Sequence, residues 1–96
     1  MSLWSDGGYS LDLSPAIMWR SMFHCDNAYL LRTVEVEGHV CLTHKTSQTA
    51  LRGFGGPQGM VFAERLMDHI AWATGRDPLD VRYANLYGTE DRNVTP

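Results

Sequence analysis

A glycine-rich stretch constrains this chain more than any other feature of its sequence. "TALRGFGGPQGM", from Thr49 to Met60, contains four glycines, one proline and one arginine, and it leads into a segment with helical periodicity. Backbone without side chains at Gly53, Gly55 and Gly56 can adopt positive φ angles or approach another group closely. Two interpretations are open. The stretch is a tight connection between a strand and a helix, or its amides and the helix N-terminus face an anion or a flat ligand.

The stretch differs from the common nucleotide-binding loops. Lysine and serine or threonine are absent from the Walker positions, and "GFGG" does not follow the GxGxxG pattern. The spacing of the glycines alone favours the tight connection. A turn needs neither Arg52 nor Phe54, however, and an arginine and an aromatic ring flanked by glycines are also suited to line a pocket for a flat ligand. Arg20 is a candidate second cation. An exposed helical arginine needs no functional explanation, however, and the sequence does not show that Arg20 meets the loop.

The composition is that of one small globular domain. The chain has 96 residues, of which 44% are hydrophobic, and we treat residues 1–96 as one unit. The net charge of −3 and the scattered lysines and arginines exclude a nucleic-acid-binding surface. No apolar stretch reaches the roughly 18 residues that a membrane helix needs, so we expect a cytoplasmic protein without nucleic-acid or membrane partners. Residues 1–3 are set aside as a leader, and residues 89–96 are expected to form a loose tail.

The two cysteines are expected to be free thiols. Cys25 and Cys41 are too few for the disulfide framework of a secreted scaffold, so reduced, buried thiols are favoured. The chain contains no CxxC or HxxxH spacing. A cluster of these cysteines with His24 and His39 lacks the closely paired ligands of a zinc site, and we do not expect one.

The first part of the chain predicts a strand followed by a helix. Gly8–Leu13 alternates apolar and polar side chains, which predicts a short strand. Ser14 as N-cap and Pro15 at the first helical position predict a helix that ends near Asp26 and Asn27. The inner side of this helix comprises Ile17, Met18, Ser21, Met22 and Cys25.

The stretch from Thr33 to Thr46 predicts a second strand. Its apolar face comprises Val34, Val36, Val40 and Leu42. Gly38 interrupts the pattern and is expected to form a bulge or a tight turn. We prefer a single bent strand over about Val34–Lys45.

Two helices are predicted after the glycine-rich stretch. Between Gly59 and Thr74, apolar residues recur at helical spacing after Pro57, and Gly75 is a natural stop. Asp77 is the N-cap of the next helix. The expected inner faces are Ala63, Leu66, Met67, Ile70, Ala71 and Thr74 in the first helix, and Leu79, Tyr83 and Leu86 in the second, which ends at Gly88. The order β-α-β-loop-α-α predicts an α+β fold, with a small sheet packed with helices.

Two stretches resemble one enzyme family. "SQTALRGFGGPQG", Ser47 to Gly59, resembles SNTAFRGFGGPQ, a motif of the molybdenum-binding subunit of the xanthine dehydrogenase and aldehyde oxidase family. "IMWRSMFHCDNAY", Ile17 to Tyr29, resembles the family's helix, which often reads MERALFHxDNxY. The separation between Arg20 and Arg52 also matches. The resemblance extends from about Gly7 to Tyr87 and implies a piece of the molybdenum-cofactor-binding domain.

The resemblance assigns roles to particular residues. In purine-oxidising members, an arginine at the position of Arg20 faces the substrate and stabilises the negative charge that develops there, as a permanent forked cation can. Aldehyde-oxidising members commonly lack this arginine, so Arg20 favours xanthine or hypoxanthine as substrate. Phe54 matches the aromatic residue that packs on the substrate ring. The backbone of Arg52 and Gly53 lies near the cofactor and the molybdenum ligands. His24 matches a family histidine to which we assign only a structural role.

Three residues depart from the family's pattern. Trp19, Gln48 and Leu51 replace the usual Glu, Asn and Phe. Trp19 directly precedes Arg20, where a bulky apolar side chain is expected to alter the packing around the arginine. The departures leave the family assignment intact and the precise substrate open.

The resemblance also implies parts that this chain does not contain. The family's general-base glutamate, its other pterin-binding loops, and its iron–sulfur and flavin parts lie elsewhere in the same chain or in partner chains. We therefore interpret the chain as a fragment of a molybdenum hydroxylase (an excised domain, a fragmentary gene product or a shortened chain), inactive alone and without tightly bound cofactor. The alternative is a stand-alone structural or interaction module that kept the fold and lost the chemistry.

Strand edges and bare apolar surface predict self-association. In the complete enzyme, both predicted strands would pair with strands absent here, and an unpaired edge is a template for another chain. A two-fold dimer is the commonest way to close such a contact. We therefore expect a homodimer that pairs through the Val34–Lys45 strand or exchanges an element between chains.

Overall fold

Residues 1–88 are described in the computed structural model of this chain, and the expected tail lies outside them. The elements in chain order are β1 (Ser2–Gly8), α1 (Ser14–Phe23), β2 (Glu37–Leu42), α2 (Gly56–Thr74) and α3 (Pro78–Asn85). The two strands form a parallel sheet. The predicted α+β fold and its β-α-β-loop-α-α order are confirmed.

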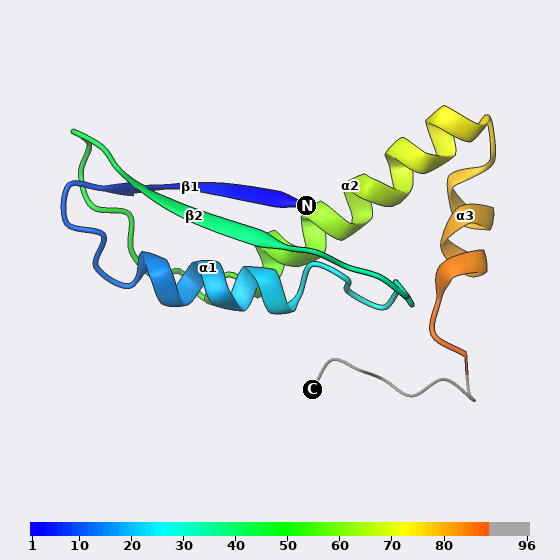
Figure 1. The fold of residues 1–96 in the computed structure, drawn as a ribbon, viewed down its shortest axis with the longest axis horizontal. Helices are drawn as coiled ribbons and strands as arrows, with labels where there is room; N and C mark the ends of the chain where they lie inside the picture. Colours follow the sequence, from blue (N-terminus) through cyan, green and yellow to red (C-terminus); the bar gives the residue numbers. More distant parts are fainter. Residues whose placement is uncertain (89–96) are drawn as a thin grey trace.

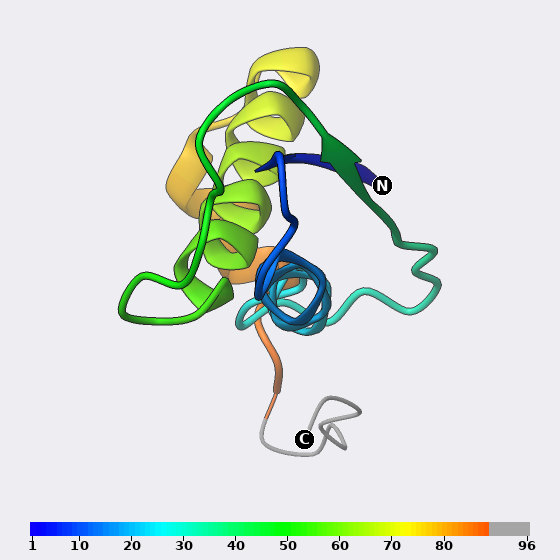
Figure 2. The ribbon, with the colours of Figure 1, turned by 90° about the vertical axis from the view of Figure 1, so that its left-hand side faces the viewer.

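α1 packs on the sheet, whereas α2 and α3 pack against each other as a helical hairpin. α1 runs along one face of the sheet and contacts both strands, and α2 begins beside α1 (Figures 1 and 2). The far end of α2 leaves the sheet and packs with α3 (Figure 1). The glycine-rich stretch precedes α2, so it lies where the sheet, α1 and α2 come together.

β1 lies earlier in the chain than predicted. The predicted strand at Gly8–Leu13 is wrong, because β1 ends at Gly8 and the following residues turn toward α1. Leu11 and Asp12 have φ angles of 57° and 43°, which extended backbone does not allow. Residues 2 and 3, set aside as a leader, belong to β1, and Leu3 is buried. The alternation of apolar and polar residues over Gly8–Leu13 therefore belongs to a turn and not to a strand.

β2 is shorter than predicted and is regular at its glycine. The strand covers Glu37–Leu42 rather than Val34–Lys45. Gly38 lies inside the strand and forms neither a bulge nor a turn; the irregularity in the ladder falls in β1. A Cβ on Gly38 would stand 2.6 Å from Met18 Cγ and from Met22 Sδ. The glycine therefore lets α1 pack closely against the sheet.

The predicted buried face of β2 is only partly covered. Val36 and Val40 are half-buried, but Val34 is 45% exposed and Leu42 is 65% exposed. A single helix, α1, packs on this two-stranded sheet, so the apolar side chains beyond its reach stay exposed.

α1 starts where the sequence predicts it, but a different residue is its N-cap. Its first residue is Ser14, with Leu13 as the N-cap, so the predicted Ser14 cap is wrong. The Ser14 hydroxyl instead donates to the carbonyl of Gln48, 2.7 Å away, and ties α1 to the chain that leads into the glycine-rich stretch. The helix ends at Phe23, earlier than predicted, and Cys25 is buried in the turn that follows.

α2 contains the centre of the core. It begins at Gly56, earlier than predicted, and it ends as predicted at Gly75, which adopts a left-handed φ of 65°. Ala63, Met67 and Ala71 are each 1% exposed, so this part of the predicted inner face is confirmed. The predicted inner residues at the margin of the stripe, Ile70 and Thr74, are exposed.

α3 presents a different face to the core from the one predicted. The Asp77 cap is confirmed, since its carboxylate accepts a hydrogen bond from Leu79 N at 2.7 Å. The predicted inner stripe is wrong, because Leu79, Tyr83 and Leu86 are 55%, 67% and 41% exposed. Val81 is buried instead and packs with Tyr29 and the α2 core residues.

A large apolar surface remains exposed. Among its members are Trp4, Tyr9, Trp19, Phe23, Leu51, Val61, Trp72 and Tyr83, each at least 64% exposed. Where such side chains lie together, they are typical of a surface that another protein covers. No helix within residues 1–88 is long and apolar enough to cross a membrane.

Candidate functional site

The glycine-rich loop is held in an unusual backbone conformation. Gly53, Phe54 and Gly55 have consecutive positive φ angles of 96°, 51° and 98°. Phe54 N donates to the Leu51 carbonyl and Gly56 N to the Gly53 carbonyl, both at 2.9 Å, which closes two successive turns. A non-glycine residue in this region costs roughly 1 kcal/mol or more, and such residues cluster at functional sites.

The glycines let α2 approach the backbone of α1. A Cβ on Gly55 would collide with the carbonyl oxygen of Ile17, and a Cβ on Gly59 would collide with that of Ser21. The stretch is therefore a tight connection that needs glycine, which is the first of the two interpretations of its sequence. At Gly55 and Gly59 the close neighbour is α1 itself, so these two glycines need no metal centre to explain them.

Arg20 meets the loop. A Cβ placed on Gly56 would lie 3.7 Å from Arg20 Nε and 3.4 Å from His24 Cδ2. The structure therefore brings Arg20 of α1 and His24, the C-cap of that helix, to the first residue of α2, which the sequence alone did not show. In the described part of the chain, no hydrogen bond or ion pair engages the guanidinium of Arg20 or that of Arg52.

The loop also presents unpaired backbone donors. Within residues 1–88, the amides of residues 49–53 donate to no protein acceptor, and all five residues are exposed. Arg52 and Gly53 lie at the end of this run, immediately before the turn at Phe54. Exposed amides next to a helix N-terminus suit polar or anionic groups of a ligand.

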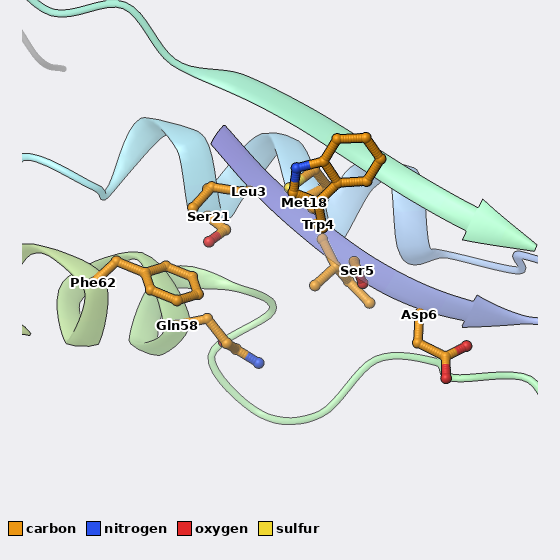
Figure 3. Close-up of a pocket in the computed structure, with 9 residues that line it drawn as sticks. Leu3, Trp4, Ser5, Asp6, Met18, Ser21, Gln58 and Phe62 are labelled. Carbon is orange, nitrogen blue, oxygen red and sulfur yellow. The ribbon is translucent and has the colours of Figure 1, made fainter. Parts of the chain in front are cut away.

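Two cavities adjoin the loop. One of about 250 Å³ is lined by Leu51, Arg52, Pro57, Gln58, Val61 and Phe62. Gln58 and Phe62 also line a second cavity of about 280 Å³ between β1, α1 and the start of α2 (Figure 3). Phe54 is half-buried and lines neither of these two cavities.

Trp19 does not share the surroundings of Arg20. Its side chain lines a groove of about 420 Å³ with Met22, Phe23 and Val36, between α1 and the chain that enters β2. Arg20 instead lies beside Gly56. The groove at Trp19 and the space beside Gly56 have different lining residues, and the expected effect of Trp19 on the packing of Arg20 stays a prediction.

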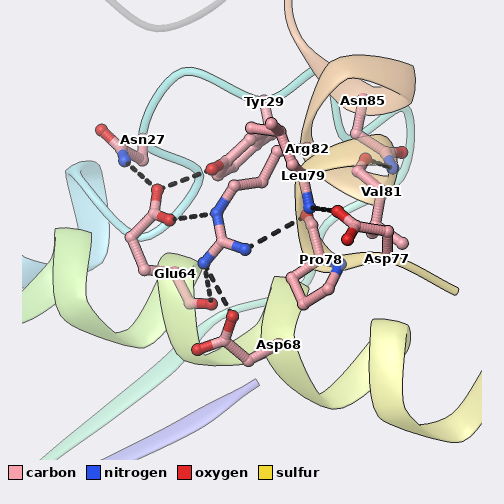
Figure 4. A network of polar contacts seen from close by, with 10 residues as sticks. All are labelled: Asn27, Tyr29, Glu64, Asp68, Asp77, Pro78, Leu79, Val81, Arg82 and Asn85. Carbon is pink, nitrogen blue, oxygen red and sulfur yellow. Dashed lines mark hydrogen bonds and ion pairs between the residues drawn. The ribbon is translucent and has the colours of Figure 1, made fainter.

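A polar network that the sequence did not indicate joins the segment after α1 to both later helices (Figure 4). Glu64 accepts hydrogen bonds from Asn27 Nδ2 at 2.8 Å, Tyr29 Oη at 2.6 Å and Arg82 Nε at 2.8 Å. Arg82 Nη2 also reaches Asp68 at 2.8 Å. The hydrogen bonds from Tyr29 and Arg82 lower the pKa of Glu64, while burial and the Glu64 carboxylate raise the pKa of Tyr29.

This network explains the orientation of α3. Glu64 and Asp68 lie one turn apart on α2, and Arg82 spans both carboxylates. The bridge turns Val81 toward α2 and leaves Leu79 exposed. The i, i+4 carboxylates were the available signal, but nothing in the sequence indicated that their partner lay on α3.

The described thiols and imidazoles form no metal site. Cys25 and Cys41 are free thiols, as predicted, and burial raises the pKa of Cys25. Across residues 1–88, no three His, Cys, Asp or Glu side chains are placed to hold a metal ion. His39 stacks on Trp4 instead, with ring centroids 4.1 Å apart.

The comparisons with known proteins agree with this fold and loop. The family model described as the molybdopterin cofactor-binding domain matches residues 1–86, and the chain belongs to that family. The similar proteins and structures are xanthine dehydrogenases and aldehyde oxidoreductases, so the chain is a segment of a protein of the xanthine dehydrogenase and aldehyde oxidase family.

Individual relatives show how much of an enzyme the chain spans. It is 46% identical over 91 residues to xanthine dehydrogenase/oxidase of Gallus gallus, covering 95% of this chain and 7% of that protein. It is 47% identical over 87 residues to the Mus musculus protein of the same name, covering 91% of this chain and 6% of that one. Aldehyde oxidoreductase from Desulfovibrio gigas superimposes with a TM-score of 0.75 and 28% identity, over 96% of this chain and 11% of that one.

Proposed function

We propose that this chain forms one wall of the molybdenum site of a hydroxylase that acts on purines such as xanthine or hypoxanthine. The observation that carries the proposal is the placement of Arg20, a cation without a protein partner in residues 1–88, against the first residue of α2. The similarity to xanthine dehydrogenases supports the choice of substrate class. The free thiols of Cys25 and Cys41 suit a reducing compartment such as the cytoplasm.

The loop fits the family's cofactor. The amides of residues 49–53 offer consecutive donors, and the adjoining helix N-terminus favours negative charge. We assign the backbone of Arg52 and Gly53 to polar groups of the cofactor close to the molybdenum. The bound cofactor supplies the oxidative hydroxylation chemistry, and the loop's own task is to hold and orient it.

Arg20 and Phe54 are assigned to the substrate. A guanidinium keeps its charge at all relevant pH values and offers a planar fork of donors to a purine carbonyl. Such a group stabilises negative charge that develops on the purine in the transition state. Phe54, held by the loop's positive φ angles, is assigned to pack against the flat ring.

Other parts of the enzyme would have to complete the site. The chain spans about 7% of the length of the xanthine dehydrogenases that it matches. The general base, the remaining pterin contacts and the iron–sulfur and flavin parts are proposed to come from outside it. The chain alone is then inactive, and its exposed apolar side chains are faces that pack against those parts. In isolation we propose that it forms a homodimer, since each strand of the sheet has only one partner strand within residues 1–88.

The test replaces the matching 91 residues of the Gallus gallus enzyme with this segment and then introduces Arg20→Met. We expect xanthine oxidation to fall about 10²–10³-fold, the usual effect of removing one preorganised charge stabiliser, and oxidation of an aromatic aldehyde to fall much less. Arg76→Met, an exposed arginine after α2, is the matched control and leaves both rates unchanged. Equal losses on both substrates would show that Arg20 is only structural. If the segment is instead a structural module that has lost the chemistry, the chimera would not oxidise xanthine even without Arg20→Met.

A further inference from the structure

The space above Gly56 is shared by the side chains of Arg20 on α1 and of His24, the residue that caps the C-terminus of α1. From the position of a Cβ on Gly56, His24 Cδ2 lies at 3.4 Å, His24 Nε2 at 3.7 Å and Arg20 Nε at 3.7 Å. Arg20 is exposed and His24 is half-buried. The more buried His24 and the more exposed Arg20 therefore both border this space.

The start of α2 packs closely against the backbone of His24. A Cβ on Gly59 would stand 2.9 Å from the carbonyl carbon of His24 and 3.1 Å from its Cβ, so the start of α2 presses directly on this residue. His24 N also donates to the Ser21 carbonyl at 3.2 Å. Arg20 has a long flexible stem, and ordering such a side chain costs up to about 2 kcal/mol.

Polar contacts within residues 1–88 do not hold Arg20 in place. Among the described residues, neither its guanidinium nor the His24 imidazole takes part in a hydrogen bond or an ion pair. The space beside Arg20 Nε is bounded by Gly56 of α2, and the His24 ring lines the same space. A side chain whose orientation depends on packing responds to changes in the neighbour that it packs against.

We infer that His24 is a positioning residue that holds the Arg20 guanidinium over Gly56. The inference rests on the proposed function, in which Arg20 faces a purine. His24 touches neither substrate nor cofactor in this role; it narrows the orientations open to Arg20. Misplacing a stabilising group by about 1 Å can cost up to about 10²-fold in rate, so partial freedom of Arg20 should cost about tenfold.

A double-mutant cycle in the chimeric enzyme tests the inference. His24→Ala is expected to lower kcat on xanthine about tenfold and to change aldehyde oxidation less than twofold. In the Arg20→Met background, His24→Ala is expected to have no further effect, because it acts through the arginine. His24→Asn, which keeps polar bulk at the position, is expected to restore most of the rate. His69→Ala, an exposed histidine on α2, is the control without effect.

A second readout does not depend on activity. In the 96-residue chain, the Gly56 Hα protons are expected to show nuclear Overhauser contacts to His24 Hδ2 and to Arg20 Hε, and the contact to Arg20 is expected to weaken in His24→Ala. An unchanged contact to Arg20 would overturn the inference. The inference would also be overturned if His24→Ala lowered xanthine oxidation by the same factor with Arg20 present and with Arg20→Met, because such a residue only supports the fold. Failure of the proposed function appears separately, as equal effects of Arg20→Met on both substrates.

Discussion

Gly59→Ala should destabilise the chain although the residue lies in a helix. Alanine in a helix normally gains up to about 1 kcal/mol over glycine. At Gly59, however, the new methyl would overlap the carbonyl oxygen of Ser21 and lie 2.9 Å from the carbonyl carbon of His24. Both neighbours are backbone, so α1 and α2 must move apart, and such overpacking costs about 1–3 kcal/mol. We expect a net loss of about 1 to 2 kcal/mol in the free energy of unfolding.

Gly56→Ala is the matched control for this prediction. Gly56 lies in the same turn of α2, its φ is not positive, and the nearest neighbour of a new methyl would be the His24 ring at 3.4 Å, an ordinary contact. This variant should be as stable as the original chain or slightly more so. Urea denaturation followed by circular dichroism measures both, with the slope against urea expected to stay constant. Equal stability of the two variants would refute the argument that the glycines exist for helix contact.

Three further predictions follow from other parts of the structure. Tyr29 and Arg82 lower the pKa of Glu64, so the carboxylate stabilises the fold at pH values above its ordinary pKa of 4.5 and loses this effect as the pH falls through the lowered pKa. Glu64→Gln should therefore lower the free energy of unfolding at pH 7, and the difference in this free energy between the variant and the original chain should become smaller in acid. Urea denaturation at each pH measures both values. The isolated chain, produced in a host that makes the cofactor, should contain almost no molybdenum by elemental analysis, and a near-stoichiometric content would contradict the fragment interpretation. Sedimentation equilibrium at micromolar concentration should give twice the chain mass of 10.8 kDa, and a persistent monomer would show that the strand edges are better protected than argued.

Local signals that depend on neighbouring residues were readable from the sequence. Gly75 ends α2 because only a residue tolerant of positive φ fits there, and Asp77 caps α3 because a short carboxylate reaches a free amide two residues on. The stripe of Ala63 and Met67 was likewise visible as helical spacing. Each of these signals concerns residues within about two turns of one another.

Features set by distant contacts were not readable. The orientation of α3 depends on Arg82 reaching two carboxylates 14 and 18 positions earlier, and the hydrophobic spacing of Leu79 pointed to the opposite face. Gly38 looked like a bulge, but its neighbours are Met18 and Met22 on another element. Such contacts become visible only when the chain is folded.

The candidate site divides in the same way. The glycine-rich loop and the separate arginine were recognisable as motifs, but their meeting at Gly56 is a tertiary contact. The free amides of residues 49–53 are likewise a property of the folded loop. The role that we propose for His24 was not readable from the sequence, because it depends on the way α2 packs against the end of α1.

The most direct measurement of the central claim uses the unsubstituted chimera of the Gallus gallus enzyme, in which this segment replaces the matching 91 residues. Its molybdenum content and its steady-state rate on xanthine are measured beside those of the unaltered enzyme. If the segment forms a wall of a purine-hydroxylating molybdenum site, the chimera takes up molybdenum and oxidises xanthine within about tenfold of the unaltered enzyme, a difference of about 1.4 kcal/mol in the barrier. A chimera that takes up no molybdenum, or that holds it fully and leaves xanthine unoxidised, would contradict the claim.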